Sequence, residues 1–341
     1  MRRSFLLFFP AAILVVALAG FSWVPAAQAQ AKPEVVTIGF QVIPNGEIVA
    51  KQLGWLEKEM GVKIKWVQFD SGRDVNIAMA AGSIDLGLVG TSPGAAGIST
   101  GVPYEVIWLH DIIGENEALV VRKDRGINRV ADLEGKKVAA PFGSTTHYHL
   151  LVALKVFNVD PKKVTILDMQ PPDMLAAWLR GDLDAGFVWE PTLVKMSEAN
   201  GKVIVSSREL AERGFLTGDL CVVRKEFARK YPDLVAKYLQ LQNKAVELYH
   251  SRPMEAAEAV GKDFNIPPGE AERQMKTLIL VPGKEQLSDK YLGTSAKRGE
   301  LAKVLKETAD FLVAQKTIKS APPLDTFEKT INPSYLERAL K

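Results

Sequence analysis

Cysteine is almost absent from this sequence, which has only Cys221 among its 341 residues. A single cysteine excludes an intramolecular disulfide, so core packing alone must hold the folded chain together. The composition, 47% hydrophobic and 24% charged, is that of a globular chain long enough to form two units. It excludes disordered, collagen-like and disulfide-stapled proteins.

An excess of one charge is also missing, because 43 Lys and Arg stand against 40 Asp and Glu. Arg2 and Arg3 lie in the first 29 residues, which contain no acid, so 41 basic and 40 acidic side chains remain in the other 312 residues. This balance leaves no electrostatic footprint for binding nucleic acid.

A long apolar segment occurs only at the start, where residues 5–21 are interrupted at Pro10 and followed by Ala27-Gln28-Ala29. Basic residues, an apolar segment and small residues in this order predict a secretory signal peptide over residues 1–29, cleaved near Ala29. A retained membrane anchor is the alternative, because residues 5–24 could span a bilayer. A lipid anchor is excluded, because no cysteine stands at the cleavage position.

Short apolar segments alternate with helix-period segments as far as about residue 225, which predicts an α/β fold with mostly parallel sheets flanked by helices. Ser71, Ser144 and the segment Thr91-Ser92-Pro93 stand where helix caps belong, and Gly82 and Gly181 stand where helices end. From residue 225 onward the pattern predicts helices alone. The predicted strands cover residues 35–41, 63–69, 86–90, 106–110, 137–140, 164–167, 185–189 and 202–205.

One internal repeat predicts two similar lobes. Residues 82–93 resemble residues 181–191, sharing Gly, Asp, Gly, Val and Pro at nearly the same spacing. Both segments contain a predicted strand, and ligands of open α/β sheets bind outside the carboxyl ends of the strands. The ends of these two strands are therefore expected to face one crevice.

A second repeat predicts where the chain passes between the lobes. Val120-Val-Arg-Lys123 recurs as Val222-Val-Arg-Lys225, preceded by Glu117 and Asp219 respectively. We interpret these as twin strands at two hinge crossings, near residues 118 and 221; a chance match of common residues is the alternative. The expected organisation is a first lobe of residues 30–117 and 222–341, with a helical C-terminal segment, and a second lobe of residues 118–221.

The segment Gly90-Thr91-Ser92-Pro93-Gly94 matches the G-x-S-x-G pattern of a serine nucleophile at a strand-to-helix turn. In such hydrolases the N–H group after the serine stabilises the oxyanion, and Pro93 has no N–H group. Asp219 and His250 follow in an order that a catalytic triad allows, but no Gly-rich oxyanion motif precedes Ser92. A serine hydrolase is therefore the disfavoured alternative, and Ser92 is interpreted as a capping residue at a helix start that attracts anions.

The four histidines do not predict a metal site. His147 and His149 fall in the first turn of a predicted helix, where side chains two residues apart point in different directions. His110 and His250 have no Cys or His partner nearby in the sequence. We interpret His149 as a helix-surface residue, retain His147 as a possible hydrogen-bond donor to a ligand, and expect no cofactor.

Trp189 and Glu190 end the strand of the second repeat. Trp189 is interpreted either as a wall of the crevice or as a core aromatic residue. Glu190 at that depth needs a cationic or hydrogen-bonding partner.

The order of these motifs resembles the periplasmic taurine-binding proteins of ABC importers, within a wider family that binds alkanesulfonates, nitrate and thiamine-precursor pyrimidines. The resemblance covers about residues 35–230. Its motifs are Phe40-Gln41, Phe69-Asp-Ser-Gly72, Gly90-Thr-Ser-Pro93, Asn116-Glu-Ala-Leu-Val120, Pro141-Phe-Gly-Ser-Thr-Thr-His-Tyr148, Gln170-Pro-Pro172, Ala176-Ala-Trp178, Arg180-Gly-Asp182, Val188-Trp189 and Asp219 with Val222-Val-Arg-Lys225.

The resemblance implies a two-lobed type II binding protein, not an enzyme, that closes over taurine or a related sulfonate and delivers it to a permease driven by a separate ATPase subunit. It further implies a monomer in the periplasm. A protein of the same fold for nitrate or a pyrimidine, including a biosynthetic or sensory relative, is the alternative.

Taurine pairs a sulfonate with an ammonium group, so hydroxyls at helix starts and carboxylates or aromatic rings are expected to hold it. Glu190 and Cys221 depart from the taurine-binding pattern, and either Glu190 or Asp219 is expected to hold the amine. The expected ligand-binding residues are Gln41, Thr91, Ser92, Glu117, Ser144, Thr145, Thr146, His147, Tyr148, Trp189, Glu190 and Asp219.

Overall fold

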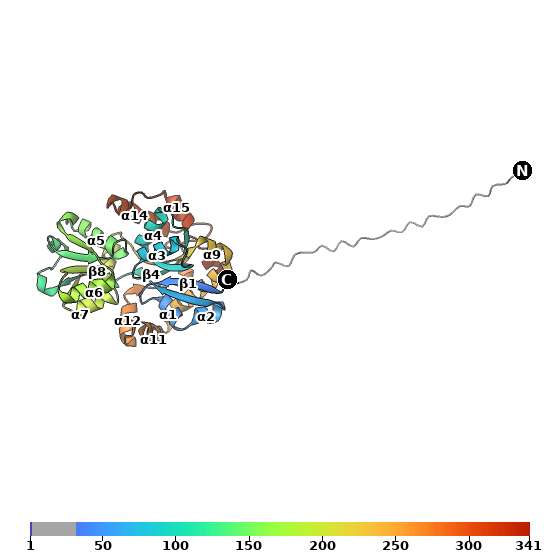
Figure 1. The fold of residues 1–341 in the computed structure, drawn as a ribbon, viewed down its shortest axis with the longest axis horizontal. Coiled ribbons are helices and arrows are strands. Elements are labelled where there is room, and N and C mark those ends of the chain that lie inside the picture. Colours follow the sequence, from blue (N-terminus) through green and yellow to red (C-terminus); the bar gives the residue numbers. More distant parts are fainter. Residues whose placement is uncertain (2–31) are drawn as a thin grey trace. The chain divides into compact units, whose positions relative to one another are not determined.

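Two β-sheets organise the chain in the computed structural model, which describes Met1 and residues 32–341 (Figure 1). The predicted signal peptide lies outside the described residues except for Met1. Among the described residues, no helix combines the length and the apolar character needed to cross a membrane.

The first lobe is built on a six-stranded sheet. Its strands, in spatial order, are β11 (Leu278–Ile279), β4 (Tyr104–Ile113), β10 (Gly218–Arg224), β3 (Leu86–Gly90), β1 (Val35–Phe40) and β2 (Lys63–Gln68). Strands β1, β2 and β3 are parallel, whereas β10 is antiparallel to both of its neighbours, β3 and β4.

The second lobe is built on a five-stranded sheet. Its strands, in spatial order, are β7 (Thr165–Asp168), β6 (Lys137–Ala140), β8 (Ala185–Trp189), β5 (Glu117–Arg122) and β9 (Gly201–Ser206). Here β6, β7 and β8 are parallel and β5 is antiparallel to β8 and β9. Five strands of the first sheet therefore have counterparts at equivalent positions in the second, with β11 as the additional strand, and β5 and β10 hold the same antiparallel position.

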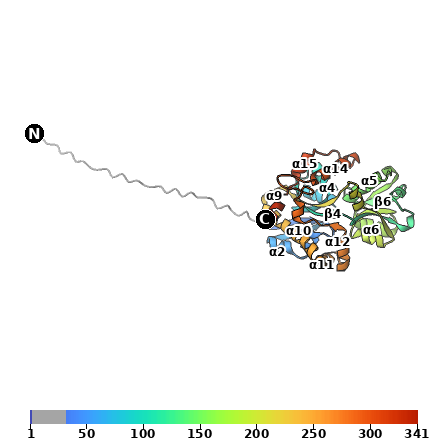
Figure 2. The same cartoon turned by 180° about the vertical axis from the view of Figure 1, so that it is seen from behind.

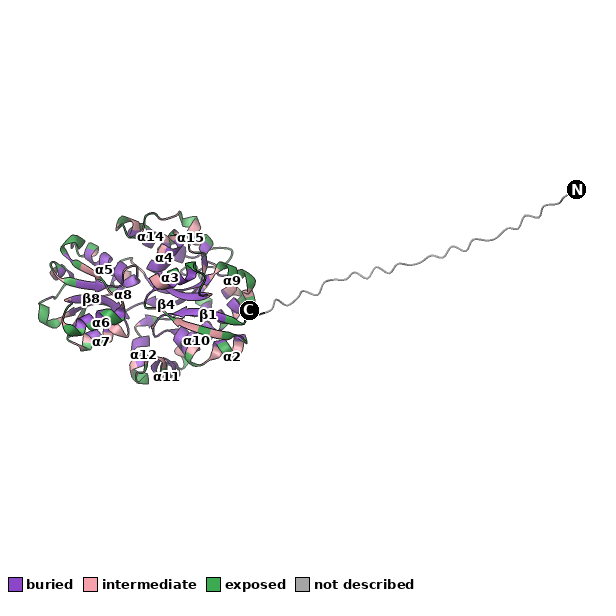
Figure 3. Ribbon diagram, viewed as in Figure 1, coloured by how far each residue is buried: buried purple, intermediate pink, exposed green. Residues whose placement is uncertain are grey.

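Helices cover both faces of each sheet (Figures 1 and 2). The central strands, such as β3 and β8, are buried, whereas the outer strands β2, β7 and β9 are partly exposed (Figure 3). In the second lobe the helices are α5 (Thr145–Val156), α6 (Pro171–Arg180), α7 (Thr192–Glu198) and α8 (Ser207–Glu212), with 3₁₀ turns at Lys123–Arg125, Val130–Leu133 and Pro161–Lys163. In the first lobe they are α1 (Gly46–Gln52), α2 (Trp55–Met60), α3 (Gly72–Ala80), α4 (Thr91–Ser99), α9 (Lys225–Lys230), α10 (Pro232–Ser251), α11 (Pro253–Phe264), α12 (Pro268–Met275), α13 (Gly283–Gln286), α14 (Leu301–Ala314), α15 (Leu324–Thr330) and α16 (Ser334–Ala339).

A shared aspartate explains the internal repeat. Asp85 accepts a hydrogen bond from the Thr37 N–H on the neighbouring strand, and Asp184 accepts one from the Lys137 N–H, both at 2.9 Å. The second repeat contacts the same two aspartates. The Arg224 N–H donates to the Asp85 carbonyl oxygen, and the Arg122 N–H donates to the Asp184 carbonyl oxygen. The repeated segments thus close equivalent corners of the two sheets.

The structure differs from the sequence predictions at several strands and helix starts. All of β10 belongs to the six-stranded sheet, so the chain returns to it ahead of Gly218, whereas the return was expected near residue 221. Helix α4 begins at Thr91, with Gly90 as its cap, so the Thr91 and Ser92 hydroxyls are not caps. The prediction of helices alone after residue 225 is wrong at β11, which pairs with the edge of β4.

The C-terminal helix α14 joins the cores of the two lobes. It packs on α4 of the first lobe, while Phe311 and Leu312 belong to a hydrophobic cluster formed mainly by the second lobe. The ring of Phe311 meets the ring of Tyr148 edge-on at a centroid distance of 5.0 Å. A helix distant in sequence therefore supports the second lobe beside the start of α5.

Candidate functional site

A small cavity of about 10 Å³ lies between the lobes at the carboxyl ends of β1, β3 and β8. Both lobes contribute to its wall, as expected for open α/β sheets whose strand ends face one crevice. The residues that line it are Gln41, Ile43, Gly72, Gly90, Pro93, Glu117, Ser144, Thr145, Trp189 and Asp219.

Three helices begin at this cavity. Helix α3 begins at Gly72, α4 is capped by Gly90, and α5 begins at Thr145. Neither α3 nor α4 has a side chain bonded to its first-turn N–H groups. Unpaired N–H groups and the positive ends of the helix dipoles make such a convergence a binding place for an anion.

The hydroxyls at the start of α5 are engaged within the protein. Ser144 Oγ donates to the Pro141 carbonyl oxygen at 2.6 Å, contacts Thr146 Oγ1 and accepts the His147 N–H. Thr145 Oγ1 donates to Glu117 Oε1 at 2.6 Å. The N–H groups of this helix start are therefore better placed to receive an anion than its side-chain hydroxyls.

The hydroxyls of Thr91 and Ser92 are in the opposite situation. Both residues are buried in the first turn of α4, and neither oxygen has a hydrogen-bond partner among the described residues. A buried hydroxyl without a partner costs about 1–3 kcal/mol. The Thr91 and Ser92 hydroxyls can therefore each donate a hydrogen bond to a ligand, although neither residue lines the cavity in this structure.

The two acids of the cavity occupy equivalent positions. Asp219 in β10 lies opposite Gly90 in β3, and Glu117 in β5 lies opposite Trp189 in β8. Burial raises the pKa of Asp219 to about 7. Burial, with the negative charge of Asp219 nearby, raises the pKa of Glu117 to about 8. No basic side chain lines this cavity in the described structure. A ligand that balances the negative charge of these acids must therefore carry a cationic group.

A third acid, Asp111, lies behind Asp219 and was not predicted from the sequence. It is fully buried in β4, directly opposite Asp219, and it accepts a hydrogen bond from Asn45 at 3.1 Å. The sequence contains a signal for Asp111: it is an acid inside the apolar strand Tyr104–Ile113, and a buried acid needs a polar partner.

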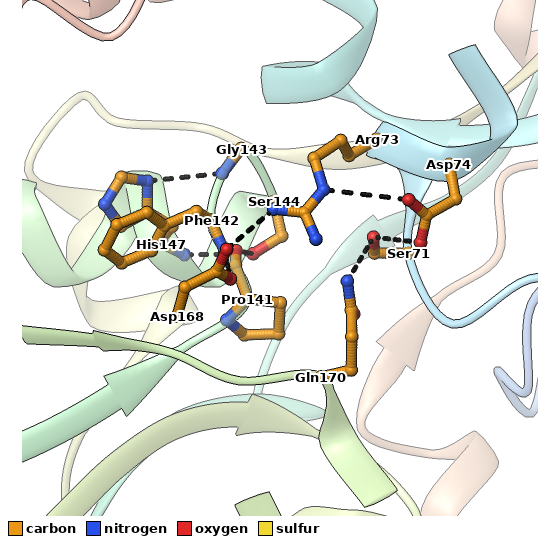
Figure 4. A network of polar contacts seen from close by, with 10 residues as sticks. All are labelled: Ser71, Arg73, Asp74, Pro141, Phe142, Gly143, Ser144, His147, Asp168 and Gln170. Atoms are coloured by element: carbon orange, nitrogen blue, oxygen red, sulfur yellow. Dashed lines mark hydrogen bonds and ion pairs between the residues drawn. The ribbon is translucent and has the colours of Figure 1, made fainter. Parts of the chain in front are cut away.

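Polar contacts join the lobes at the rim of the cavity (Figure 4). Arg73 at the start of α3 pairs with Asp168 at the end of β7, with 2.9 Å between Nη1 and Oδ2. Gln170 Nε2 donates to Ser71 Oγ at 3.2 Å. Within the second lobe, the Phe142 N–H donates to the same carboxylate of Asp168 at 2.8 Å, which connects the loop before α5 to this contact. The structure is therefore a closed arrangement in which α3 meets the loops before α5 and α6.

Six of the twelve expected site residues line the cavity, and six do not. The first six are Gln41, Glu117, Ser144, Thr145, Trp189 and Asp219. The others are Thr91, Ser92, Thr146, His147, Tyr148 and Glu190, of which Thr91, Ser92 and Thr146 lie in the first turns of α4 and α5.

The remaining three expected residues have other contacts. His147 stacks on Phe142 with 4.5 Å between the ring centroids, and burial lowers its pKa to about 4. Tyr148 packs in the second-lobe core, and Glu190 Oε2 accepts the Val194 N–H at 2.9 Å in the first turn of α7.

His149 differs from the prediction of a helix-surface residue. It is completely buried, and its ring nitrogens contact Ser207 Oγ at 2.7 Å and the Phe215 carbonyl oxygen at 2.9 Å. It therefore joins α5 to α8 and to the segment before β10. Among residues 32–341, no cluster of three or more His, Cys, Asp or Glu side chains has the arrangement of a metal site.

Four lining residues were missed: Ile43, Gly72, Gly90 and Pro93. Gly72 and Gly90 belong to motifs that the sequence analysis identified, but glycines have no side chain to suggest a chemical role. These glycines allow neighbouring segments to pack closely, since a Cβ on Gly72 would lie only 2.7 Å from Pro93 Cγ. Both glycines allow backbone N–H groups to reach the cavity wall.

Known proteins resemble this chain in sequence over most of its length. The sequence pattern of the NMT1/THI5-like family matches residues 44–256. The chain is 36% identical to the taurine-binding periplasmic protein of Escherichia coli (strain K12), over 84% of this chain and 88% of that protein. It is 30% identical to an aliphatic sulfonates-binding protein of Bacillus subtilis (strain 168), named as putative, over 90% of this chain and 88% of that protein.

Among solved structures, the alkanesulfonate-binding protein of Xanthomonas axonopodis pv. citri, bound to MOPS, superposes with a TM-score of 0.74. The match covers 88% of this chain and 99% of that protein at 23% identity, so it shows the fold. These relatives are solute-binding proteins and not enzymes. The chain therefore belongs to the NMT1/THI5-like family and, within it, to the two-lobed solute-binding proteins that include the taurine- and sulfonate-binding proteins.

Proposed function

We propose that this protein binds taurine, or a closely related amino-sulfonate, between its lobes. The observation that carries the proposal is the pairing of opposite features in one small cavity. Three helix N-termini can receive an anion, and two acids that have no basic partner among the described residues can receive a cation. A sulfonate and an ammonium group two carbons apart match these two requirements.

Within this proposal, Asp219 receives the ammonium group and Glu190 does not. Asp219 lines the cavity, whereas one carboxylate oxygen of Glu190 is occupied by the Val194 N–H. Trp189 forms a wall beside Glu117, its neighbour across β8 and β5. The sulfonate lies against the starts of α3, α4 and α5.

The protein delivers its ligand to an ABC-type permease that a separate ATPase subunit drives. It works as a monomer in the periplasm after removal of residues 1–29. The lobes are those expected from the sequence, residues 30–117 with 222–341 and residues 118–221, except at two boundaries. Glu117 joins the second lobe with the rest of β5, and residues 218–221 join the first lobe with the rest of β10. Closure presents both lobes together to the permease.

Calorimetry of the protein lacking residues 1–29 tests the ligand. Titrations with taurine, ethanesulfonate, nitrate and an aminopyrimidine form one series. We expect taurine to bind with micromolar or better affinity and more tightly than ethanesulfonate, because only taurine has an ammonium group that can pair with the carboxylates. Tight binding of nitrate or the aminopyrimidine without binding of taurine would refute the proposal.

A further inference from the structure

Asp111 and Asp219 form an acid pair on neighbouring strands, one behind the other as seen from the cavity. They are directly opposite in the antiparallel register of β4 and β10, which makes their side chains neighbours on the same face of the sheet. Only Asp219 lines the cavity. Two carboxylates that approach this closely in a buried place cannot both be ionised without a compensating cation.

Among the described residues, no basic side chain acts on either acid. Lys51 acts on the nearby Glu47 and pairs with Asp263. The charged groups that act on Asp111 are acids, Asp219 in β10 and Glu117 in β5. Glu47 at the start of α1 is another acid near Asp219. His110 lies beside Glu47 and is neutral, because burial lowers the pKa of His110 to about 3. Burial raises the pKa of Asp111 well above its usual range.

The hydrogen bonds of Asp111 indicate which acid holds the proton. Its Oδ2 accepts the Asn45 amide at 3.1 Å, while its Oδ1 is fully buried and has no donor among the described residues. A proton on Oδ1 would satisfy that oxygen and would give Asp219 a hydrogen bond. Asp219, at the cavity wall, can instead use the ammonium group of a ligand as its second partner.

We propose that Asp111 is a positioning residue, held as a neutral acid, whose O–H group donates to Asp219 so that Asp219 alone carries the negative charge offered to an ammonium ligand. The inference rests on the proposed binding of an amino-sulfonate. It implies that Asp111 determines the preference for amines without touching the ligand.

Two substitutions distinguish this role from the alternatives. Asp111→Asn stays neutral, and its amide can accept from Asn45 and donate to Asp219, so taurine affinity should remain within about threefold of the parent. Asp111→Ala removes the donor, so taurine affinity at neutral pH should fall about tenfold or more while ethanesulfonate affinity changes little. If Asp111→Asn weakens taurine more than tenfold, Asp111 acts as a charge and the proposal fails.

Proton release upon binding gives a readout that a structural role would not change. Calorimetry at about pH 6 in buffers with different ionisation enthalpies counts the protons released with taurine and with ethanesulfonate. Parent and Asp111→Asn should release the same number with taurine, and ethanesulfonate should release none. One proton fewer from Asp111→Asn would show that Asp111 ionises upon binding, which overturns the proposal. Equal loss of both ligands in Asp111→Ala would leave only a structural role, which also overturns it.

A measurement on the unmodified sequence covers the case in which the variants do not fold. Infrared spectra of protein labelled with ¹³C at aspartate carboxyls should retain a protonated-aspartate band with taurine bound at about pH 7.5. Absence of that band would contradict the proposal. Failure of the parent to bind taurine at all, with ethanesulfonate still binding, would instead refute the proposed function.

Discussion

A Cβ atom on Gly90 would lie 2.6 Å from Cγ2 of Thr145, which belongs to the other lobe. Glycine at position 90 is therefore a condition for the lobes to meet in the closed arrangement, although its φ of −67° is open to any residue. The same missing side chain leaves Asp219 Oδ1 close to the start of α4.

The first prediction follows from this contact. Gly90→Ala should weaken all ligands of the cavity alike, by about tenfold or more, because the added methyl group opposes closure. Gly94→Ala, in the first turn of α4, is the matched control, since its added Cβ would lie nearest to Leu220 Cδ1 of its own lobe, at 3.3 Å. Calorimetry measures the affinities, and X-ray scattering should show that ligand reduces the radius of gyration less in Gly90→Ala than in the parent. An unaffected Gly90→Ala would mean that the lobes do not approach here.

The second prediction concerns the unpaired hydroxyl of Ser92. Ser92→Ala should leave the melting temperature of the free protein unchanged or higher, because it removes a buried polar group without a partner. If the hydroxyl donates to a bound sulfonate, taurine and ethanesulfonate should both lose about 1–3 kcal/mol of binding free energy. Thermal melts and calorimetry give the two quantities. A destabilised free protein would show that Ser92 already has a partner.

The third prediction separates the two acids suggested by the sequence. Asp219→Asn should weaken taurine at least tenfold more than ethanesulfonate, because only taurine needs the charge. Glu190→Ala should lower stability through the lost contact with the Val194 N–H and leave the ratio of the two affinities unchanged. The reverse pattern would assign the amine to Glu190.

The fourth prediction is a pH dependence of stability. Glu47, Glu117 and Asp219 have pKa values raised to about 7, 8 and 7, so folding favours their protonated forms. Their contribution to stability is complete below the unfolded pKa values and is lost as pH rises through about 7 to 8. The melting temperature of the free protein should therefore fall from about pH 6.5 to about pH 8.5.

The buried histidines do not reverse this trend. Burial lowers the pKa values of His110, His147 and His149, so their contribution is lost only as pH falls below the usual value of 6.5. Glu117→Gln should flatten the decline above neutral pH, because it removes one titrating group and keeps a hydrogen-bonding side chain. A melting temperature that rises over this interval would contradict the placement of the acids.

The fifth prediction concerns the contact between the lobes at the rim. Arg73→Ala should weaken taurine and ethanesulfonate equally and by less than about fivefold, because exposed ion pairs contribute about 0–1 kcal/mol. The effect should shrink at high salt. Arg129→Ala is the control, since Arg129 pairs with Asp132 inside the second lobe. Fluorescence of Trp189, absent from Trp189→Phe, should report closure in each titration; a change in the preference between ligands would place Arg73 in the binding site.

Much of this fold could be predicted because its repeats are local and regular. The strands ending at Gly90 and Trp189 were predicted at their observed bounds, since each apolar segment lies between a glycine turn and a helix start. Asp219 and Glu117 could be found because each precedes a copy of the same strand sequence.

The rest of the site depended on packing that the sequence does not display. Glu190 is next to Trp189, but its side chain turns to α7. His149 was predicted to lie on a helix surface, because the sequence of α5 does not show that α8 and Phe215 pack over it. The place of Asp111 behind the cavity could not be predicted, because its neighbour Asp219 lies on β10, more than a hundred residues later in the chain.

The place of β10 between β3 and β4 also sets the order in which the molecule can be assembled. The five strands of the second lobe lie in one continuous stretch, from Glu117 to Ser206, and can pair as soon as that stretch is made. The first lobe keeps a gap between two open strand edges until residues 218–224 arrive. Since the same strand carries Asp219, the binding cavity cannot be completed during synthesis until every strand of the second lobe has been made.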